Sequence, residues 1–184
     1  MIFPIVVYGD PILRKKAEPI TPDYPGLAEF LTDFWETMYV ADGVGLAAPQ
    51  VGRSIRIFVL DASAGADDDP SLKDFKKVFI NPVMLETPGE DIVIEEGCLS
   101  LPEIREKITR PDTVRIRYQD ENFEVHEETF SGFAARIIQH EYDHLEGKMF
   151  IDYLSPLRRK LMKNRLMNIS KGKVTPKYKI RVPV

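Results

Sequence analysis

The sequence predicts an α+β fold in which mostly antiparallel sheets pack around a central helix, with one helix before the strands and one at the C-terminal end. Short apolar or alternating segments typical of strands fill the middle of the chain, and longer amphipathic segments flank them. The strand segments show no regular alternation with helices, which argues against a parallel sheet. At 184 residues, 43% of them hydrophobic, the chain suits one domain spanning 1–184.

A first amphipathic helix is expected over residues 25–41. Leu27, Phe30, Phe34 and Met38 recur there at helical spacing with acidic residues between them, which gives the helix one apolar face to pack on a core. Strands are expected after it, because short apolar runs indicate buried strands and two-residue alternation indicates half-buried ones. These segments are 55–60, 76–85, 91–96, 113–120 and 123–130.

Two further helices have recognisable starts. Ser131-Gly132 opens a segment that closes at Gly147, since glycine favours the end of a helix. Ser155-Pro156 combines a good N-cap residue with a proline suited to the first turn, so a C-terminal helix is expected to begin there. Asp120-Glu121-Asn122 predicts a hairpin turn between the last two strands.

Two segments are interpreted as additions at the surface. Residues 62–75 begin with the small, acidic and turn-rich run ASAGADDDP, which indicates a surface loop. Residues 170–184 form a basic tail interrupted by prolines, and two interpretations remain open for it: a loosely attached arm or an edge strand.

Composition narrows the functional class. The net charge of −4 gives no reason to expect nucleic acid as the main partner, and no apolar run is long enough to cross a membrane. The N-terminal residues lack the features of a signal or transit peptide. Cys98 is the only cysteine, so the chain has no intramolecular disulfide. We therefore expect a cytoplasmic protein.

His140-Glu141-Tyr142-Asp143-His144 indicates a metal site on the second helix. Histidines four positions apart fall on one face of a helix, where both imidazoles can reach one ion and the glutamate can reach a water on it. The same pattern also arises by chance on surface helices. Asp143 and Glu146 are most simply solvated residues of the helix face.

A catalytic site of this kind needs a third protein ligand. His126 is one candidate, although its surroundings favour an exposed strand residue. Cys98 is the stronger candidate because it follows a glycine where a strand ends, and a thiolate suits Fe(II), Co(II), Ni(II) and Zn(II). A lone cysteine is nevertheless more often a small buried hydrophobic residue.

Residues 42–52 form a loop rich in glycine and alanine, which allows backbone to approach a ligand closely. The loop follows a helix and precedes a strand, the reverse of the order in a dinucleotide-binding motif, so that motif is excluded. Gln50 could direct its amide at a carbonyl oxygen. The alternative is a tight helix-to-strand connection.

The three segments together resemble the peptide deformylase family, which is marked by a GxGLAAPQ loop, an EGCLS segment and a QHExDHL helix. They stand here, in the family's order, as Gly43–Gln50, Glu96–Ser100 and Gln139–Leu145. The segment Tyr8–Arg14 is also similar to the opening of that family, and the resemblance extends to about residue 160.

This resemblance implies a hydrolase that removes the formyl group from N-terminal formylmethionine during protein biosynthesis. It implies metal binding by Cys98, His140 and His144, with Fe(II) most usual and Zn(II), Ni(II) or Co(II) accepted. It also implies a general base at Glu141 and oxyanion stabilisation by Gln50 and the backbone N–H of Leu99. Substrate contacts are expected at Gly43, Val44, Gly45, Glu96 and Gly97.

Periodicity adds Arg136 and Ile137 to the expected substrate site. Arg136 lies one turn before His140, where it could touch substrate backbone, pair with an acid or remain at the surface. Ile137 would then line the pocket for methionine. Glu96 is expected to be held by an arginine such as Arg110 or Arg105.

The implied partners are nascent formylmethionyl polypeptides and the ribosome near its exit tunnel, in the bacterial cytoplasm. No sequence-specific nucleic-acid recognition and no membrane association are expected. Two rival functions share part of the pattern. A zinc endopeptidase would take a third ligand downstream of the helix, and a structural zinc site would need a cysteine-rich set of four ligands. Neither requirement is met by this sequence.

Overall fold

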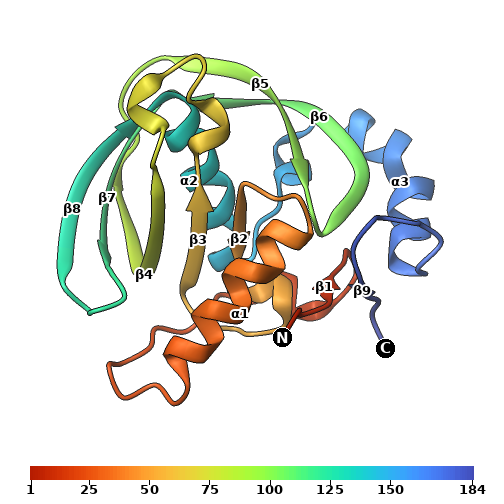
Figure 1. Cartoon of the computed structure of the whole chain (residues 1–184). Coiled ribbons are helices and arrows are strands. Elements are labelled where there is room, and N and C mark those ends of the chain that lie inside the picture. The colour runs from red at the N-terminus through yellow and green to blue at the C-terminus, as the bar shows by residue number, and fades with distance from the viewer.

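All residues, 1–184, are described by the structure, which is a computed structural model. Three α-helices and nine strands follow one another along the chain (Figure 1). The helices are α1 (Leu27–Val40), α2 (Gly132–Leu145) and α3 (Pro156–Ser170). The strands are β1 (Ile5–Val6), β2 (Gly45–Ala47), β3 (Ile57–Asp61), β4 (Lys76–Glu86), β5 (Asp91–Cys98), β6 (Leu101–Pro111), β7 (Thr113–Gln119), β8 (Val125–Ser131) and β9 (Ile180–Arg181).

Most strand pairs are antiparallel. The main sheet has five strands in the order β2-β3-β4-β7-β8, and each neighbouring pair in it is antiparallel. β5 and β6 form a separate antiparallel hairpin, whereas the short pair β1–β9 is parallel. In Figure 1 the long hairpin arches over the molecule, and its tip is directed toward β1 and β9. The predicted α+β class with mostly antiparallel sheets is confirmed.

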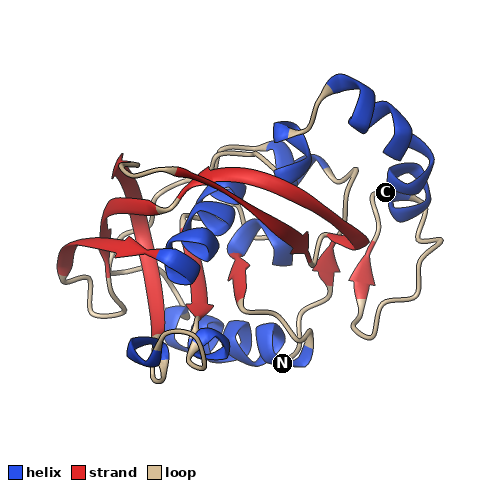
Figure 2. Cartoon of the chain, turned by 90° about the horizontal axis from the view of Figure 1, so that it is seen from above, coloured by secondary structure: helices blue, strands red, loops and turns tan.

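A helix packs on each face of the main sheet. Successive side chains of β3 point to opposite faces, so Phe58 and Leu60 lie on one side and Ile57 and Val59 on the other. Phe58 and Leu60 join a core that includes Ile138 of α2, whereas Ile57 and Val59 join a core built on α1. Figure 2 shows α2 between the main sheet and the β5–β6 hairpin. α2 is therefore the central helix, and many of its polar side chains lie inside the protein.

Three strands have no counterpart in the sequence prediction: the two-residue β1, β2 and β6. β2 lies within the glycine- and alanine-rich loop, whose small residues carry no strand pattern. β6 does alternate, and Ile104 and Ile108 are buried on its inner face. Its inner face also carries Glu106 and Arg110, however, so charged residues interrupt the apolar half of the pattern. The alternation of β6 is consequently visible in the burial of its side chains but not in the pattern of residue types.

The expected helix boundaries agree with the structure. α3 begins at Pro156, and the Ser155 hydroxyl accepts a hydrogen bond from the backbone N–H of Arg158 at 3.2 Å. α2 begins directly after Ser131 and ends two residues before Gly147. The predicted hairpin turn between β7 and β8 is also present, where the Asp120 carboxylate accepts backbone N–H groups of the turn.

The two surface segments are partly ordered by the core. Residues 62–75 contain two short 3₁₀ turns, and Leu72 anchors the segment in the core beside α2. In the tail, β9 pairs with β1, where the N–H of Ile5 donates to the carbonyl of Lys179 at 2.9 Å. Of the two interpretations of the tail, the strand is correct. No helix of the structure combines the length and apolar character needed to cross a membrane.

Candidate metal centre and active site

Three metal-ligating side chains meet between α2 and the tip of the β5–β6 hairpin. His140 and His144 lie one turn apart on α2, with ring centroids separated by 5.1 Å. Cys98, the last residue of β5, places its Sγ 3.4 Å from His144 Nε2. One donor atom from each of the three residues lies within 4.8 Å of the other two. His126 is instead on β8, paired with Asp120 at 2.7 Å, so Cys98 is the candidate that the fold brings to the helix.

The chemistry of this donor set fits a divalent transition metal. A thiolate and two imidazoles supply three ligands of the kind preferred by Fe(II), Co(II), Ni(II) and Zn(II), and leave a coordination position open. His140 Nδ1 lies 2.8 Å from Glu96 Oε1, which leaves Nε2 as its free nitrogen. Burial lowers the pKa of His144 and keeps its imidazole neutral, the form that binds a metal.

Glu96 is the centre of a buried charged network behind His140. Arg110 donates two hydrogen bonds to its carboxylate, at 2.7 and 3.1 Å, and Arg136 donates a third at 2.9 Å. Burial raises the pKa of Glu96, but the hydrogen bonds from His140 and Arg110 outweigh it and hold that pKa well below its usual range. Glu96 is therefore ionised and fixes the orientation of the His140 ring.

The arginine partners can now be assigned. Of the two arginines expected for Glu96, Arg110 is the one that binds it, because Arg105 pairs with Glu95 at the surface at 3.0 Å. The sequence left three roles open for Arg136: contact with substrate backbone, pairing with an acidic residue, or exposure at the surface. The structure shows pairing with an acidic residue. Arg136 is buried, with only 6% of its surface exposed, and its guanidinium also donates to the carbonyls of Ile108 and Ile92.

Two acidic residues of the α2 region differ from their sequence interpretation. Asp143 is buried and receives hydrogen bonds from Arg110 and from the hydroxyl of Tyr153, each at 2.8 Å. Glu146 is half-buried and forms an ion pair with Arg56 at 2.7 Å. The interpretation of both as solvated residues is wrong, because Arg110 of β6 covers Asp143 and Arg56, just before β3, pairs with Glu146.

Glu141 lies in the same cluster with one oxygen free. Its side chain is buried, its Oε2 has no hydrogen-bond partner, and burial raises its pKa to about 7. The backbone of β2 passes directly beside it. A Cβ at Gly45 would lie 2.6 Å from Glu141 Oε1 and 2.8 Å from Ile137 Cγ2, so this position requires glycine.

Two hydrogen-bond donors lie beside Cys98. The Gln50 carbonyl oxygen accepts the N–H of Ala47 at 2.9 Å, which directs its Nε2 toward Cys98 Sγ at 3.6 Å and Ser100 Oγ at 3.2 Å. The backbone N–H of Leu99 donates to no acceptor within the protein. Both groups can therefore donate to a ligand that enters beside the cysteine.

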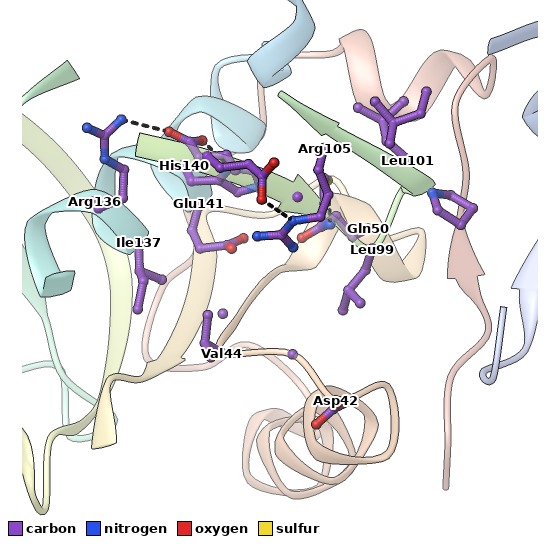
Figure 3. A pocket seen from close by; sticks show the side chains of 18 of the residues that line it. Asp42, Val44, Gln50, Leu99, Leu101, Arg105, Arg136, Ile137, His140 and Glu141 are labelled. Atoms are coloured by element: carbon purple, nitrogen blue, oxygen red, sulfur yellow. Dashed lines mark hydrogen bonds and ion pairs between the residues drawn. The ribbon is translucent and has the colours of Figure 1, made fainter. Parts of the chain in front are cut away.

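These residues line an open pocket of about 500 Å³, within the range of small-ligand sites (Figure 3). The pocket collects every residue predicted to contact substrate, with Glu96 and Arg136 in its wall. Its apolar lining includes Val44, Leu101 and Ile137. Tyr178, from the C-terminal tail, also reaches it.

Comparison with known proteins decides the family. Residues 2–160 match the sequence model of the polypeptide deformylases. The chain belongs to this family. Over its whole length it is 53% identical to the peptide deformylase of Christiangramia forsetii, covering 97% of that protein. The crystal structure of the Thermotoga maritima peptide deformylase is 45% identical, with a TM-score of 0.76 over 85% of this chain and 99% of the other. The peptide deformylase of Thermus thermophilus is 36% identical, with a TM-score of 0.82 over 94% of this chain and 99% of the other.

The enzyme accordingly removes the formyl group from the N-terminal formylmethionine of polypeptides. Deformylases use a single catalytic metal, and Cys98, His140 and His144 form the candidate site for it in this chain. Neither rival function, a zinc endopeptidase or a structural zinc site, agrees with this family membership. The upstream cysteine that argued against both from sequence is indeed the residue that the fold places beside the histidines.

Sequence reasoning missed two parts of the site. Arg110 was expected as a partner of Glu96, but its link through Asp143 to Tyr153 depends on the packing of β6 against α2. Tyr178 has no distinguishing sequence pattern, and its hydroxyl donates to the carbonyl of Leu99 at 2.8 Å. This contact joins the tail to the residue next to Cys98, and only the fold reveals it.

Proposed function

We propose that Cys98, His140 and His144 hold one divalent ion in this enzyme, Fe(II) natively, with Zn(II), Ni(II) or Co(II) able to replace it. The observation that carries the proposal is the meeting of one thiol and two imidazoles around the pocket that contains Glu141. Mg²⁺ and Ca²⁺ would favour oxygen ligands instead. When bound, such an ion lowers the pKa of a coordinated water to about 7 and polarises a carbonyl oxygen.

Glu141 is the general base in this proposal. Its unpartnered Oε2 is available to accept a proton from the attacking water, and a pKa of about 7 suits proton transfer near neutral pH. Glu141 then delivers that proton to the amine as the formyl C–N bond breaks, and the products are formate and a free N-terminus. The buried position limits competition from bulk solvent for the same proton.

Gln50 and Leu99 provide hydrogen bonds to the formyl oxygen as negative charge develops on it. The Gln50 amide is held by Ala47 on its other side, and the Leu99 N–H has no competing acceptor in the protein. Donors fixed before the reaction need no reorganisation during it, and loss of one such donor typically costs roughly 100- to 1,000-fold in rate.

The substrate backbone would lie along Gly43, Gly45 and Gly97, where missing side chains allow a close approach. The methionine side chain would pack against Val44 and Ile137, which supply apolar surface beside Glu141. Glu96 and Arg136 would support this wall rather than bind substrate, because their charged groups pair with each other.

Formate release tests the assignment of roles. Enzyme loaded with Fe(II) without oxygen should release formate from formyl-Met-peptide and leave the acetylated peptide unchanged. Glu141→Ala should retain metal while turnover falls by at least roughly 100-fold. Cys98→Ala should lose metal, measured by elemental analysis after gel filtration. Substantial turnover in Glu141→Ala, or unchanged metal content in Cys98→Ala, contradicts the corresponding role.

We also propose that the chain acts as a single catalytic domain in the bacterial cytoplasm, on polypeptides emerging from the ribosome. Bacterial relatives support the setting, and the basic exposed face of α3 supports an electrostatic contact with the ribosome surface. Co-sedimentation with ribosomes at low salt, lost at high salt, tests this contact. Binding that is absent at low salt contradicts it.

A further inference from the structure

The two ends of the chain meet at the turn that follows Cys98. Cys98 pairs with Leu101 across the β5–β6 hairpin, so Leu99 and Ser100 are the two central residues of its turn. β1 and β9 lie side by side near this tip (Figure 1). The turn therefore lies between the metal-ligating cysteine and the paired termini.

Each terminus supplies a hydrogen bond to one carbonyl of the turn. The central carbonyls of a two-residue hairpin have no partner in the strand ladder, so they must be satisfied from outside it. The Tyr178 hydroxyl donates to the carbonyl of Leu99 at 2.8 Å, and the backbone N–H of Tyr8 donates to the carbonyl of Ser100 at 2.9 Å. The Leu99–Ser100 and Ser100–Leu101 peptide groups are thus fixed in orientation.

Tyr178 is itself held in place by the strand pair beyond it. The carbonyl of Lys179 accepts the N–H of Ile5 at 2.9 Å, and the carbonyl of Arg181 accepts the N–H of Val7 at 3.1 Å. The Tyr178 ring packs on the core built on α1 and lines the pocket. Tyr178 lies outside residues 2–160, the part that matches the family's sequence model. The tail thus adds a contact to the site that the matched region does not contain.

We propose that Tyr178 is a positioning residue for deformylation. Its hydroxyl holds the Leu99–Ser100 peptide and so restricts backbone rotation at Leu99, which keeps the Leu99 N–H, in the preceding peptide group, directed at the developing oxyanion. The inference rests on the proposed role of the Leu99 N–H. Without the hydroxyl, the Leu99 carbonyl loses its hydrogen-bond donor. The Leu99–Ser100 peptide can then rotate, and the backbone torsions of Leu99, which orient its N–H, are less restricted. The N–H would then spend less time in the productive direction, with the metal ligands unchanged.

Tyr178→Phe tests this role because it keeps the ring and removes the hydroxyl. For a short formyl-Met substrate, kcat should fall about tenfold, the low end of the effect of outer contacts on an active site. KM should change less than about twofold, since the interaction acts on the transition state. Metal content should stay that of the parent enzyme. Tyr118→Phe is the matched control, because it removes a tyrosine hydroxyl bonded to Glu128 away from the pocket, and its kcat should match the parent.

The outcomes separate the inference from its alternatives. An unchanged kcat in Tyr178→Phe overturns it, as does a loss that lies in KM and grows with peptide length, which would mean direct contact with the substrate chain. Equal losses in Tyr178→Phe and Tyr118→Phe would indicate general destabilisation and also overturn it. Glu141→Ala, measured in parallel, tests the proposed general base separately. High turnover in that variant would contradict the role of Glu141 and would leave the comparison of Tyr178→Phe with the parent enzyme unaffected.

A second readout does not use activity. Amide hydrogen exchange of the metal-loaded enzyme should become faster at residues 97–101 in Tyr178→Phe, while the β7–β8 hairpin keeps the parent rate. Tyr118→Phe should leave residues 97–101 unchanged. Unaltered exchange at 97–101 in Tyr178→Phe would show that the hydroxyl does not hold the turn, and would overturn the inference even if kcat had fallen.

Discussion

Replacing Glu96 with glutamine should weaken metal binding without changing a ligand. The Glu96 carboxylate accepts two hydrogen bonds from Arg110, one from Arg136 and one from His140. Glutamine keeps the size of the side chain but removes its charge and turns one acceptor into a donor. Two of the four contacts then place donor against donor, and two buried guanidinium groups lose their shared counter-charge.

The expected magnitude follows from this geometry. Breaking a buried ion pair by removing one charge typically costs about 3–5 kcal/mol of folding free energy. The His140 ring also loses the acceptor that fixes its orientation, and loss of such an outer contact lowers metal affinity by roughly 10- to 100-fold. Glu96→Gln should therefore show both effects, in unfolding free energy and in metal affinity.

Competition with a chelator measures the metal affinity, and urea denaturation at neutral pH measures the stability. The Ni(II)-loaded enzyme avoids oxidation of iron and thiolate during the titration. Glu127→Gln is the matched control, since Glu127 also bridges two arginines, Arg115 and Arg117, but lies at the surface. Its effect should stay below about 1 kcal/mol. Chelator competition identical to that of the parent enzyme would refute the positioning role of Glu96.

Three further predictions concern the same region and the core. Gly45→Ala should retain metal but lose roughly 100-fold in kcat/KM, because the added methyl would meet Glu141 and Ile137; near-parent kinetics would contradict this. In the metal-free protein, the pKa of Glu141 is about 7, above its ordinary value of 4.5. The folded protein therefore holds the Glu141 proton more tightly than the unfolded chain does, and it loses stability as the pH rises from 4.5 to 7. Glu141→Gln should consequently be more stable than the parent by about 3 kcal/mol above pH 7, and the difference should vanish near pH 4.5; a pH-independent difference in urea denaturation contradicts the assignment. Phe79→Ala should cost about 3–5 kcal/mol, since its fully buried ring stacks on Phe58 at 4.6 Å, and a loss below about 1 kcal/mol would show that the core collapses around the gap.

Local sequence patterns predicted the elements whose apolar residues follow one clear period. α1 and α2 have uninterrupted helical patterns, and the limits of α3 follow from Ser155-Pro156. β6 escaped prediction because Glu106 and Arg110 occupy inner positions that a half-buried strand normally fills with apolar residues. Arg110 belongs to the network that supports the metal site, so the irregular pattern has in part a functional origin.

The local chemistry of the site follows from the order of the residues alone. The spacing of His140 and His144 fixes them on one helix face because helical geometry is local, and Glu141 follows from the same turn. The sequence also identified the three motifs that the family comparison bears out. The pairing of groups across the fold became visible only in three dimensions: Arg110 rather than Arg105 binds Glu96, and Tyr178 binds Leu99. These partners are far apart along the chain, so their contact depends on strand register and on how the hairpin, the central helix and the two termini pack together.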